Sequence, residues 1–249
     1  MKVILLAHTP EPEKTCAAAA RSCYSGKGAS ELISKGDTEK FLAKVVGMGH
    51  ESVIEHATFT FSVEGVSRSL THQLVRHRIA SFSQQSQRYV SLEEPTYVVP
   101  PTVGSDPEKK RIYDEAMEKA WQAYGELERL GIPAEDARYV LPNGCTTNIV
   151  ITMNARELRH LFTLRCCNRA QWEIREMADK MLELCREASP SIFKDAGAAC
   201  VRGPCPEGKK SCGHPRRRGD TDPEHPSVRV RMTDEVCRWI PRTTGTSCW

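Results

Sequence analysis

Several features that would assign this chain of 249 residues to a familiar class are missing. No stretch approaches the roughly 18 apolar residues that a membrane-spanning helix needs. The first apolar run, "VILLA" at residues 3–7, is too short for a secretory signal. Eleven cysteines are an odd number, so without a signal we expect reduced thiols and no disulfide framework. The sequence therefore predicts a cytoplasmic protein.

The familiar phosphate-binding loops are also missing. No G-x-G-x-x-G follows a strand, and "SGKGAS" at residues 25–30 lacks the spacing of G-x-x-x-x-G-K-[ST]. The net charge is only +3, from 35 basic and 32 acidic residues, which is too balanced for a protein that coats nucleic acid. Any phosphate must then be bound by local arginines, whose guanidinium groups suit its oxygens.

One segment, "RHRIASFSQQSQRY" at residues 76–89, contains no acid at all. Helical spacing of apolar residues before it predicts a helix over 66–78, which the R-H-R triplet would close. If residues 83–89 are extended, alternate side chains point the same way. An amide, a hydroxyl and a guanidinium would then lie in a row: Gln84, Ser86 and Arg88.

The remaining patterns indicate an α/β (α+β) fold, with a mixed sheet flanked by long helices. Strand-like patterns occur at residues 2–9 and 57–65. Helical spacing occurs at 12–25, 41–49, 106–131, 133–142, 155–165 and 169–188. Asn154 and Glu157 resemble a capping pair at the start of one helix. We expect one domain over residues 1–196 and an extension over 197–249, where large apolar residues become rare.

The extension contains three thiols and one imidazole that could bind zinc in a reducing cytosol: Cys200, Cys205, Cys212 and His214. Their spacing does not match a C-x-x-C knuckle, so a disordered basic extension is the alternative. The earlier group His50, Glu55 and His56 lacks the H-E-x-x-H spacing of zinc proteases. We therefore expect these three residues to position a ligand or to cap the next element.

Five blocks together resemble the flavin-dependent thymidylate synthases (ThyX family) in order and spacing. They are "GHESVIEH", "LTHQLVRHRIASFSQQSQRY", "DARYVLP", "NARELRHLFTLR" and "AQWEIRE". The acid-free segment matches the signature of that family, which is R-H-R, seven residues and then S, ending at Ser86. The likeness spans roughly residues 1–195.

The resemblance implies a function. Members methylate C5 of dUMP to give dTMP, with 5,10-methylenetetrahydrofolate as carbon donor and FAD carrying hydride from NADPH. They form homotetramers whose active sites are shared between subunits. The implied partners are therefore dUMP, folate, NADPH and further copies of the chain, with no membrane and no nucleic acid.

The resemblance also implies site residues. FAD contacts would come from Ser52, Arg76, His77, Arg78, Gln84, Asn154, Arg156 and His160. Contacts to dUMP would come from Gln73, Leu74, Val75, Arg76, Gln84, Gln85, Ser86, Gln87, Arg88, Arg138 and Arg165. Arg165 would be catalytic, because a cation at the uracil edge favours negative charge on the ring and makes C5 nucleophilic. Ser86 has no Ser-His-Asp pattern near it and is interpreted as a binding residue.

The chain departs from the family at Ser83 and Gln84, where many members carry Asn-Glu, so a carboxylate near the flavin is absent. Two other functions stay open from the sequence. One is an RNA-binding module, since arginine and aromatic residues interleave and "KKSCGHPRRR" is locally basic. The other is a cysteine-dependent thymidylate synthase, for which Cys205 in "GPCPEG" is the candidate nucleophile.

Overall fold

The computed structural model describes residues 1–90 and 96–220, and the main chain of one further strand at 228–231. The chain forms two compact units. Unit 1 contains residues 1–64, 70–83 and 148–225, and unit 2 contains 65–69, 84–147 and 226–249. Across the described residues, no helix is both long enough and apolar enough to cross a membrane.

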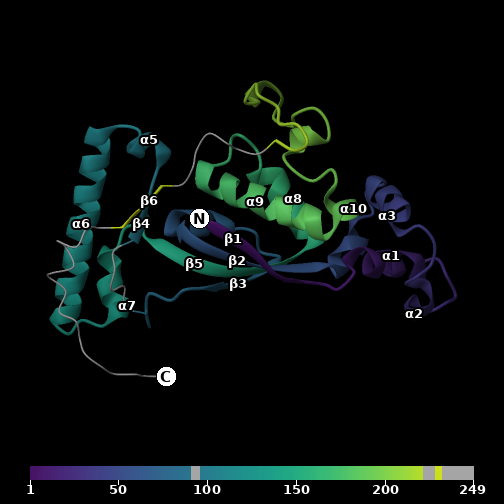
Figure 1. Cartoon of the computed structure of the whole chain (residues 1–249), viewed down its shortest axis with the longest axis horizontal. Coiled ribbons are helices and arrows are strands. Elements are labelled where there is room, and N and C mark those ends of the chain that lie inside the picture. The colour runs from purple at the N-terminus through teal and green to yellow at the C-terminus, as the bar shows by residue number, and fades with distance from the viewer. Residues whose placement is uncertain (91–95, 221–227, 232–249) are drawn as a thin grey trace. The chain divides into compact units, whose positions relative to one another are not determined.

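A four-stranded sheet has the strand order β1-β2-β5-β3 (Figure 1). Its strands are β1 (Lys2–His8), β2 (Thr58–Ser67), β5 (Thr146–Asn154) and β3 (Ala80–Gln84). Strands β1 and β2 pair in antiparallel orientation, from Lys2 opposite Glu64 to His8 opposite Phe59, with an irregularity between Leu5 and Ala7. The predicted α/β class is confirmed, and both strand-like patterns are strands.

Helices α8 (Ala155–Arg165) and α9 (Trp172–Ala188) cover one face of this sheet (Figure 1). The alternation in β2 buries Phe59, Phe61 and Val63 completely. The predicted helical stripe of α9 is buried from Ile174 to Cys185. Full burial of one such side chain stabilises the fold by about 1.5–3 kcal/mol. The alternating apolar residues of β2 and the helically spaced apolar residues of α9 together form this core.

Unit 1 also contains short helices and a 3-10 turn beside the sheet. They are α1 (Pro12–Ser22), α2 (Ala29–Leu32), α3 (Thr38–Gly47), the 3-10 turn η1 (Glu51–His56) and α10 (Pro190–Phe193). The Asp37 side chain caps α3 by accepting a hydrogen bond from the Lys40 amide. Cys16 is buried as a small hydrophobe, but Cys23 follows the end of α1 and is exposed.

Unit 2 contains the long helix α6 (Pro107–Arg129), which agrees with the predicted helix at 106–131 and is capped by the Asp106 carboxylate. Its other elements are β4 (Thr96–Val99), β6 (Val228–Arg231), α5 (Pro101–Gly104), α7 (Ala134–Ala137) and the 3-10 turn η2 (Arg138–Val140). Tyr97, Val99 and Met117 form a core cluster. The Tyr97 hydroxyl donates to Asp114 on α6, 2.8 Å away, so its polar end is satisfied.

Two predicted elements are shorter than expected around the acid-free segment. Helix α4 covers only Arg68–Leu74, because β2 continues through Ser67 and the chain turns directly after Leu74. Strand β3 ends at Gln84, and residues 87–89 form a turn. The R-H-R triplet therefore lies beyond the helix, and the predicted row of alternating side chains does not continue past β3.

Candidate active site

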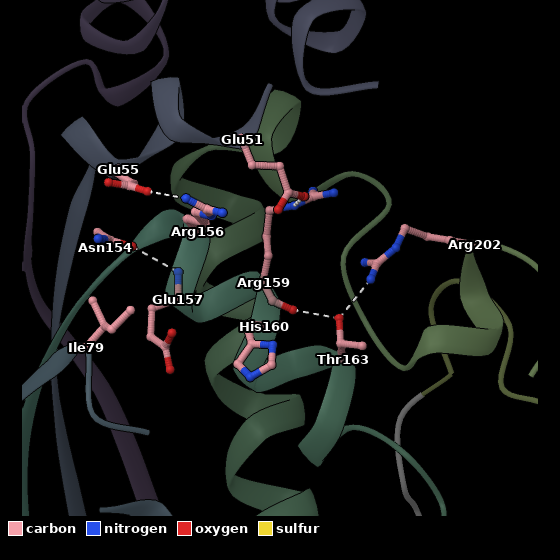
Figure 2. A pocket seen from close by; sticks show the side chains of 10 residues that line it. All are labelled: Glu51, Glu55, Ile79, Asn154, Arg156, Glu157, Arg159, His160, Thr163 and Arg202. Carbon is pink, nitrogen blue, oxygen red and sulfur yellow. Dashed lines mark hydrogen bonds and ion pairs between the residues drawn. The ribbon is translucent and has the colours of Figure 1, made fainter. Parts of the chain in front are cut away.

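A pocket of about 560 Å³ opens in unit 1 beside the first half of α8 (Figure 2). This volume lies within the range of about 300–1,000 Å³ that is typical of small-molecule sites. The lining consists of Glu51, Glu55, Ile79, Asn154, Arg156, Glu157, Arg159, His160, Thr163 and Arg202. Three residues that the family resemblance assigns to FAD are among them: Asn154, Arg156 and His160.

Helix α8 presents one side to this pocket. Asn154 caps the helix as predicted, because its Oδ1 accepts a hydrogen bond of 2.9 Å from the Glu157 amide. Arg156, His160 and Thr163 follow at positions i, i+4 and i+7, a spacing that keeps them on one helical face. Helical periodicity therefore gathers a guanidinium, an imidazole and a hydroxyl along one wall.

Two of the three carboxylates that line the pocket, Glu51 and Glu55, are paired with its arginines. Arg156 binds Glu55 at 2.5 Å, and both side chains are largely exposed. Arg159 is only 5% exposed and binds Asp195 at 2.8 Å, with Glu51 at 3.5 Å. The negative charges of Glu51 and Glu55 are thus offset by neighbouring guanidinium groups.

A buried chain of polar side chains connects α8 to the turn after α4. His77 is 4% exposed, and its Nδ1 lies 3.2 Å from Oε1 of Glu157. On the other side of the ring, Nε of Arg165 donates to Nε2 of His77 at 3.1 Å. The ring of His160 lies 5.9 Å from that of His77 in an edge-on arrangement. Residues separated by 80 and 88 positions therefore form one chain of hydrogen bonds.

The hydrogen bonds determine the protonation of His77. Arginine only donates, so Nε2 of His77 must accept from Arg165, and Nδ1 must carry the proton that Glu157 accepts. Burial and then the charge of Arg165 lower the pKa of His77, and Glu157 opposes them. His77 is therefore neutral near pH 7, with its Nδ1–H tautomer fixed by Glu157.

Arg165 is held by two hydrogen bonds, and one nitrogen remains available. Its Nη2 donates to the main-chain oxygen of Gln73 at 3.3 Å, in addition to the bond from Nε to His77. Nη1 has no hydrogen-bond partner among the described residues. Burial lowers the pKa of Arg165, but an arginine stays charged at neutral pH. Arg165 is thus a fixed cation with a nitrogen that can bind a ligand.

The remaining predicted residues of unit 1 differ in their exposure. Ser52 lies in η1, and it is exposed, as are Val75, Arg76 and Arg78 around the R-H-R triplet. Leu74 is fully buried, so it can contact a ligand only through its main chain.

Unit 2 contains the end of β3 and the turn that follows. Nε2 of Gln84 donates to Oγ1 of Thr147 at 3.3 Å, and the carbonyl of Gln85 accepts from Nη2 of Arg68 at 2.8 Å. Burial and then the charge of Arg138 lower the pKa of Arg68. The positive charges of Arg68 and Arg138 therefore repel each other. Arg68 was not predicted as a site residue, because a linear sequence pattern does not show that Arg138 influences it.

The turn itself is built from the other predicted residues. Oγ of Ser86 accepts from the Arg88 amide at 3.1 Å, so the hydroxyl stabilises the turn. Arg88 forms an ion pair of 2.8 Å with Glu135 of α7. Arg138 donates from Nε to the main-chain oxygen of the same Glu135 at 3.0 Å. Gln87, also in this turn, is half-buried.

The described residues contain no group of three or more His, Cys, Asp or Glu that could hold a metal ion. Two of the thiols have other partners instead. Cys200 Sγ accepts from the amide of Arg216 at 3.2 Å, and Cys212 Sγ accepts from the amide of His214 at 3.4 Å. The four possible zinc ligands, Cys200, Cys205, Cys212 and His214, are therefore not assembled as a tetrahedral set among the described residues.

The comparisons with known proteins agree with this geometry. The family model described as "Thymidylate synthase complementing protein" matches residues 4–191. A flavin-dependent thymidylate synthase of Geobacter sulfurreducens is 53% identical over 218 residues, covering 86% of this chain and 94% of the relative. The chain belongs to the flavin-dependent thymidylate synthase family. The predicted resemblance is confirmed, and the chain is an enzyme of this family.

Other members of the flavin-dependent thymidylate synthase family are also similar along most of the chain. The synthase of Clostridium tetani is 50% identical over 234 residues and that of Pyrococcus furiosus 47% over 219, each covering at least 83% of this chain. Among solved structures, a UMP/dUMP methylase from Streptomyces cacaoi bound with 5-Br dUMP is 26% identical, with a TM-score of 0.68. The match covers 78% of this chain and 93% of the methylase.

The pocket lining suits the flavin after which this family is named. Arg156, His160 and Asn154 offer donors for phosphate oxygens and polar ring edges. Ile79 is 67% exposed and offers an apolar surface for a ring. Thr163 and Arg202 were not predicted from the sequence: Thr163 lies within the block "NARELRHLFTLR" but was not assigned a contact, and Arg202 lies outside all five blocks.

Proposed function

We propose that the chain catalyses the reductive methylation of dUMP. In this reaction dUMP, 5,10-methylenetetrahydrofolate, NADPH and one proton give dTMP, tetrahydrofolate and NADP⁺. Membership of the flavin-dependent thymidylate synthase family supports the reaction class, and the neighbour that binds 5-Br dUMP supports the nucleotide. The observation that carries the proposal is the chain of hydrogen bonds from Glu157 through His77 to Arg165, a cation whose Nη1 has no partner among the described residues.

FAD would be held by the α8 wall of the pocket and the turn after α4. Asn154, Arg156 and His160 line the pocket, and Arg78 is exposed near Ile79, which also lines it. When bound, the flavin supplies the hydride that NADPH provides. The exposed side chain of Ser52 and those of Arg76 and Gln84 would complete the cofactor contacts that the family resemblance implies.

The nucleotide would be bound by residues on both sides of the R-H-R triplet. Gln73, Leu74 and Val75 would contribute before it, and Gln84, Gln85, Ser86, Gln87 and Arg88 after it, together with Arg138. Arg68 and Arg138 are both positively charged and influence each other, which supports binding of an anion in unit 2. We propose that this anion is the dUMP phosphate.

Arg165 would activate the uracil ring. Its Nη1 would donate to a ring oxygen, where it stabilises the negative charge that develops as C5 attacks carbon. His77 positions this guanidinium by accepting from its Nε, and Glu157 keeps the His77 tautomer that can accept. No protein nucleophile is needed in this scheme.

The cysteines support the same scheme. Burial raises the pKa of Cys16 and of Cys145 to about 12, and it raises the pKa of Cys166, beside Arg165, well above its usual value. A thiol is nucleophilic as its thiolate, so these three are poor nucleophiles. Cys205 is half-buried in the extension and does not line the pocket.

We further propose a homotetramer with shared active sites, as the family resemblance implies. Light scattering of the purified protein in solution tests this assembly. A mass of one chain in the presence of FAD and dUMP would contradict it.

A visible spectrum and an isotope assay together test the proposed reaction. The purified chain, supplied with FAD, should show a flavin spectrum. It should also release tritium from C5-labelled dUMP and form dTMP only when methylenetetrahydrofolate and NADPH are present. Retention of the C5 tritium by a flavin-loaded protein would contradict the proposal. A colourless protein that binds RNA in a salt-dependent way would favour the RNA-binding alternative.

A further inference from the structure

One arginine of the pocket lies outside the residues that the family model matches. Arg202 lies in the C-terminal extension, eleven residues beyond residue 191, where the match to the family model ends. Its Nη2 donates to Oγ1 of Thr163 at 2.7 Å, and that hydroxyl in turn donates to the main-chain oxygen of Arg159 at 2.8 Å. In Figure 2, Arg202 reaches the pocket from the side opposite to Asn154.

Arg202 extends the polar wall formed by α8. Thr163 is the third member of the stripe after Arg156 and His160, so the Arg202 guanidinium is fixed one helical turn beyond the imidazole. The stripe therefore continues from a guanidinium and an imidazole to a second guanidinium. Such a series matches a ligand with several anionic groups along its length.

Among the described residues, Arg202 forms no ion pair, unlike the other two arginines of the pocket. Arg156 has Glu55 as its partner, and Arg159 has Asp195 and Glu51. In the described part of the chain, Arg202 has no carboxylate within 4.0 Å, and its second bond is a long one of 3.5 Å to the Asp195 main-chain oxygen. Of the three arginines that line the pocket, Arg202 is therefore the one best able to bind an anionic ligand.

The extension that contributes Arg202 is firmly attached to unit 1. Arg216 is 6% exposed and binds the Asp179 carboxylate of α9 at 2.9 Å and the main-chain oxygen of Cys166 at 2.6 Å. Asn168 donates to the main chain of His214 at 2.9 Å. These contacts hold the extension against the corner between α8 and α9. The position of Arg202 thus follows from a packed segment.

We propose that Arg202 binds a phosphate group of the flavin cofactor, so that the C-terminal extension completes the cofactor pocket. This inference rests on the proposed function, because it takes FAD as the pocket ligand. A guanidinium that donates through two nitrogens suits a phosphate, and the neighbouring Arg156 and His160 are the residues expected to hold the same molecule. Arg202 accordingly discriminates between flavins that carry phosphate and flavins that do not.

Flavin binding to the full chain tests the inference without measuring turnover. Dissociation constants for FAD and for riboflavin would be measured by quenching of flavin fluorescence in the wild type, Arg202→Ala and Arg202→Lys. Arg202→Ala should weaken FAD binding about tenfold, the lower end of what a charged hydrogen bond contributes. Arg202→Lys should lose less, because the charge remains. Riboflavin binding should not change.

Arg218→Ala is the matched control, because Arg218 is exposed in the same extension and does not line the pocket. It should bind FAD as the wild type does. Wild-type FAD affinity in Arg202→Ala would overturn the inference, and so would an equal loss for FAD and riboflavin. A raised KM for the folate at unchanged FAD affinity would also overturn it and would assign Arg202 to a folate carboxylate. If the wild type itself binds no flavin, the proposed function fails instead.

Discussion

Replacing Glu157 by Gln tests the buried chain from α8 to the R-H-R triplet. The carboxylate, 7% exposed, accepts from Nδ1 of His77 at 3.2 Å and leaves Nε2 to accept from Arg165 at 3.1 Å. In Glu157→Gln the amide can instead donate to Nδ1, which moves the proton of the ring to Nε2. Two donors would then face each other between His77 and Arg165, and the guanidinium would lose its fixed position.

The expected loss follows from the bonds involved. A hydrogen bond to a charged group contributes about 1.5–3 kcal/mol. Loss of that amount in the transition state lowers kcat about tenfold to a hundredfold. The assay is dTMP formation at saturating dUMP, with ¹⁵N NMR of the His77 ring to identify the tautomer. FAD affinity should be unchanged, because the Asn154 cap, Arg156 and His160 remain in place.

The control is Glu183→Gln, since Glu183 is exposed on α9 and does not line the pocket. It should keep the wild-type kcat. The reasoning is refuted if Glu157→Gln keeps both the wild-type kcat and the Nδ1–H tautomer. A lower kcat without any change in the ring signals would also refute it, because the effect would then not pass through His77.

Three further predictions follow from the contacts around α8. Arg165→Ala should abolish tritium release while FAD stays bound, as measured by isotope assay and visible spectrum; loss of the flavin with intact dUMP binding would contradict its role. Arg216→Met should lower the free energy of unfolding by about 3 kcal/mol in urea titrations, because Asp179 loses its buried partner; a change below about 0.5 kcal/mol would contradict this. Because the folded pKa of His77 lies below 6.5, its stabilising contribution is complete above pH 6.5 and is lost as the pH falls. The difference in unfolding free energy between wild type and His77→Gln should therefore shrink in acid, and a constant difference from pH 8 to 5 would exclude the titration.

The parts of the fold with a strong local pattern could be predicted. Helix α6 follows from Asp106 as its cap and from apolar residues at helical spacing, and α8 follows from the Asn154–Glu157 cap. The alternation of β2 predicts both a strand and its buried face. The residues at which helices and strands begin and end were harder to predict. Helix α4 begins late because β2 continues through Ser67, a competition between neighbouring elements that periodicity does not measure.

The site could be predicted only in part. The spacing of Arg156 and His160 predicts a shared helical face, and both line the pocket. Thr163 lies on the same face and could have been found by extending the period one step. The position of Arg202 depends on how the extension packs, and this follows from the buried pair of Arg216 and Asp179. No local pattern encodes an ion pair between residues 37 positions apart.

The acid-free segment itself shows how local composition and three-dimensional charge differ. Its sequence suggested a set of cations without any carboxylate. In the structure, however, each compact unit supplies a carboxylate from another part of the chain. Glu157 binds His77, and Glu135 binds Arg88. The first pair is buried, so the carboxylate fixes a neutral imidazole instead of cancelling a charge. The second pair is half-exposed, so it is worth little and a phosphate can replace the carboxylate at small cost. In the proposed reaction the two acids thus have opposite consequences: Glu157 maintains the geometry of Arg165, the proposed catalytic residue, and Glu135 would give way at Arg88 to the phosphate of dUMP.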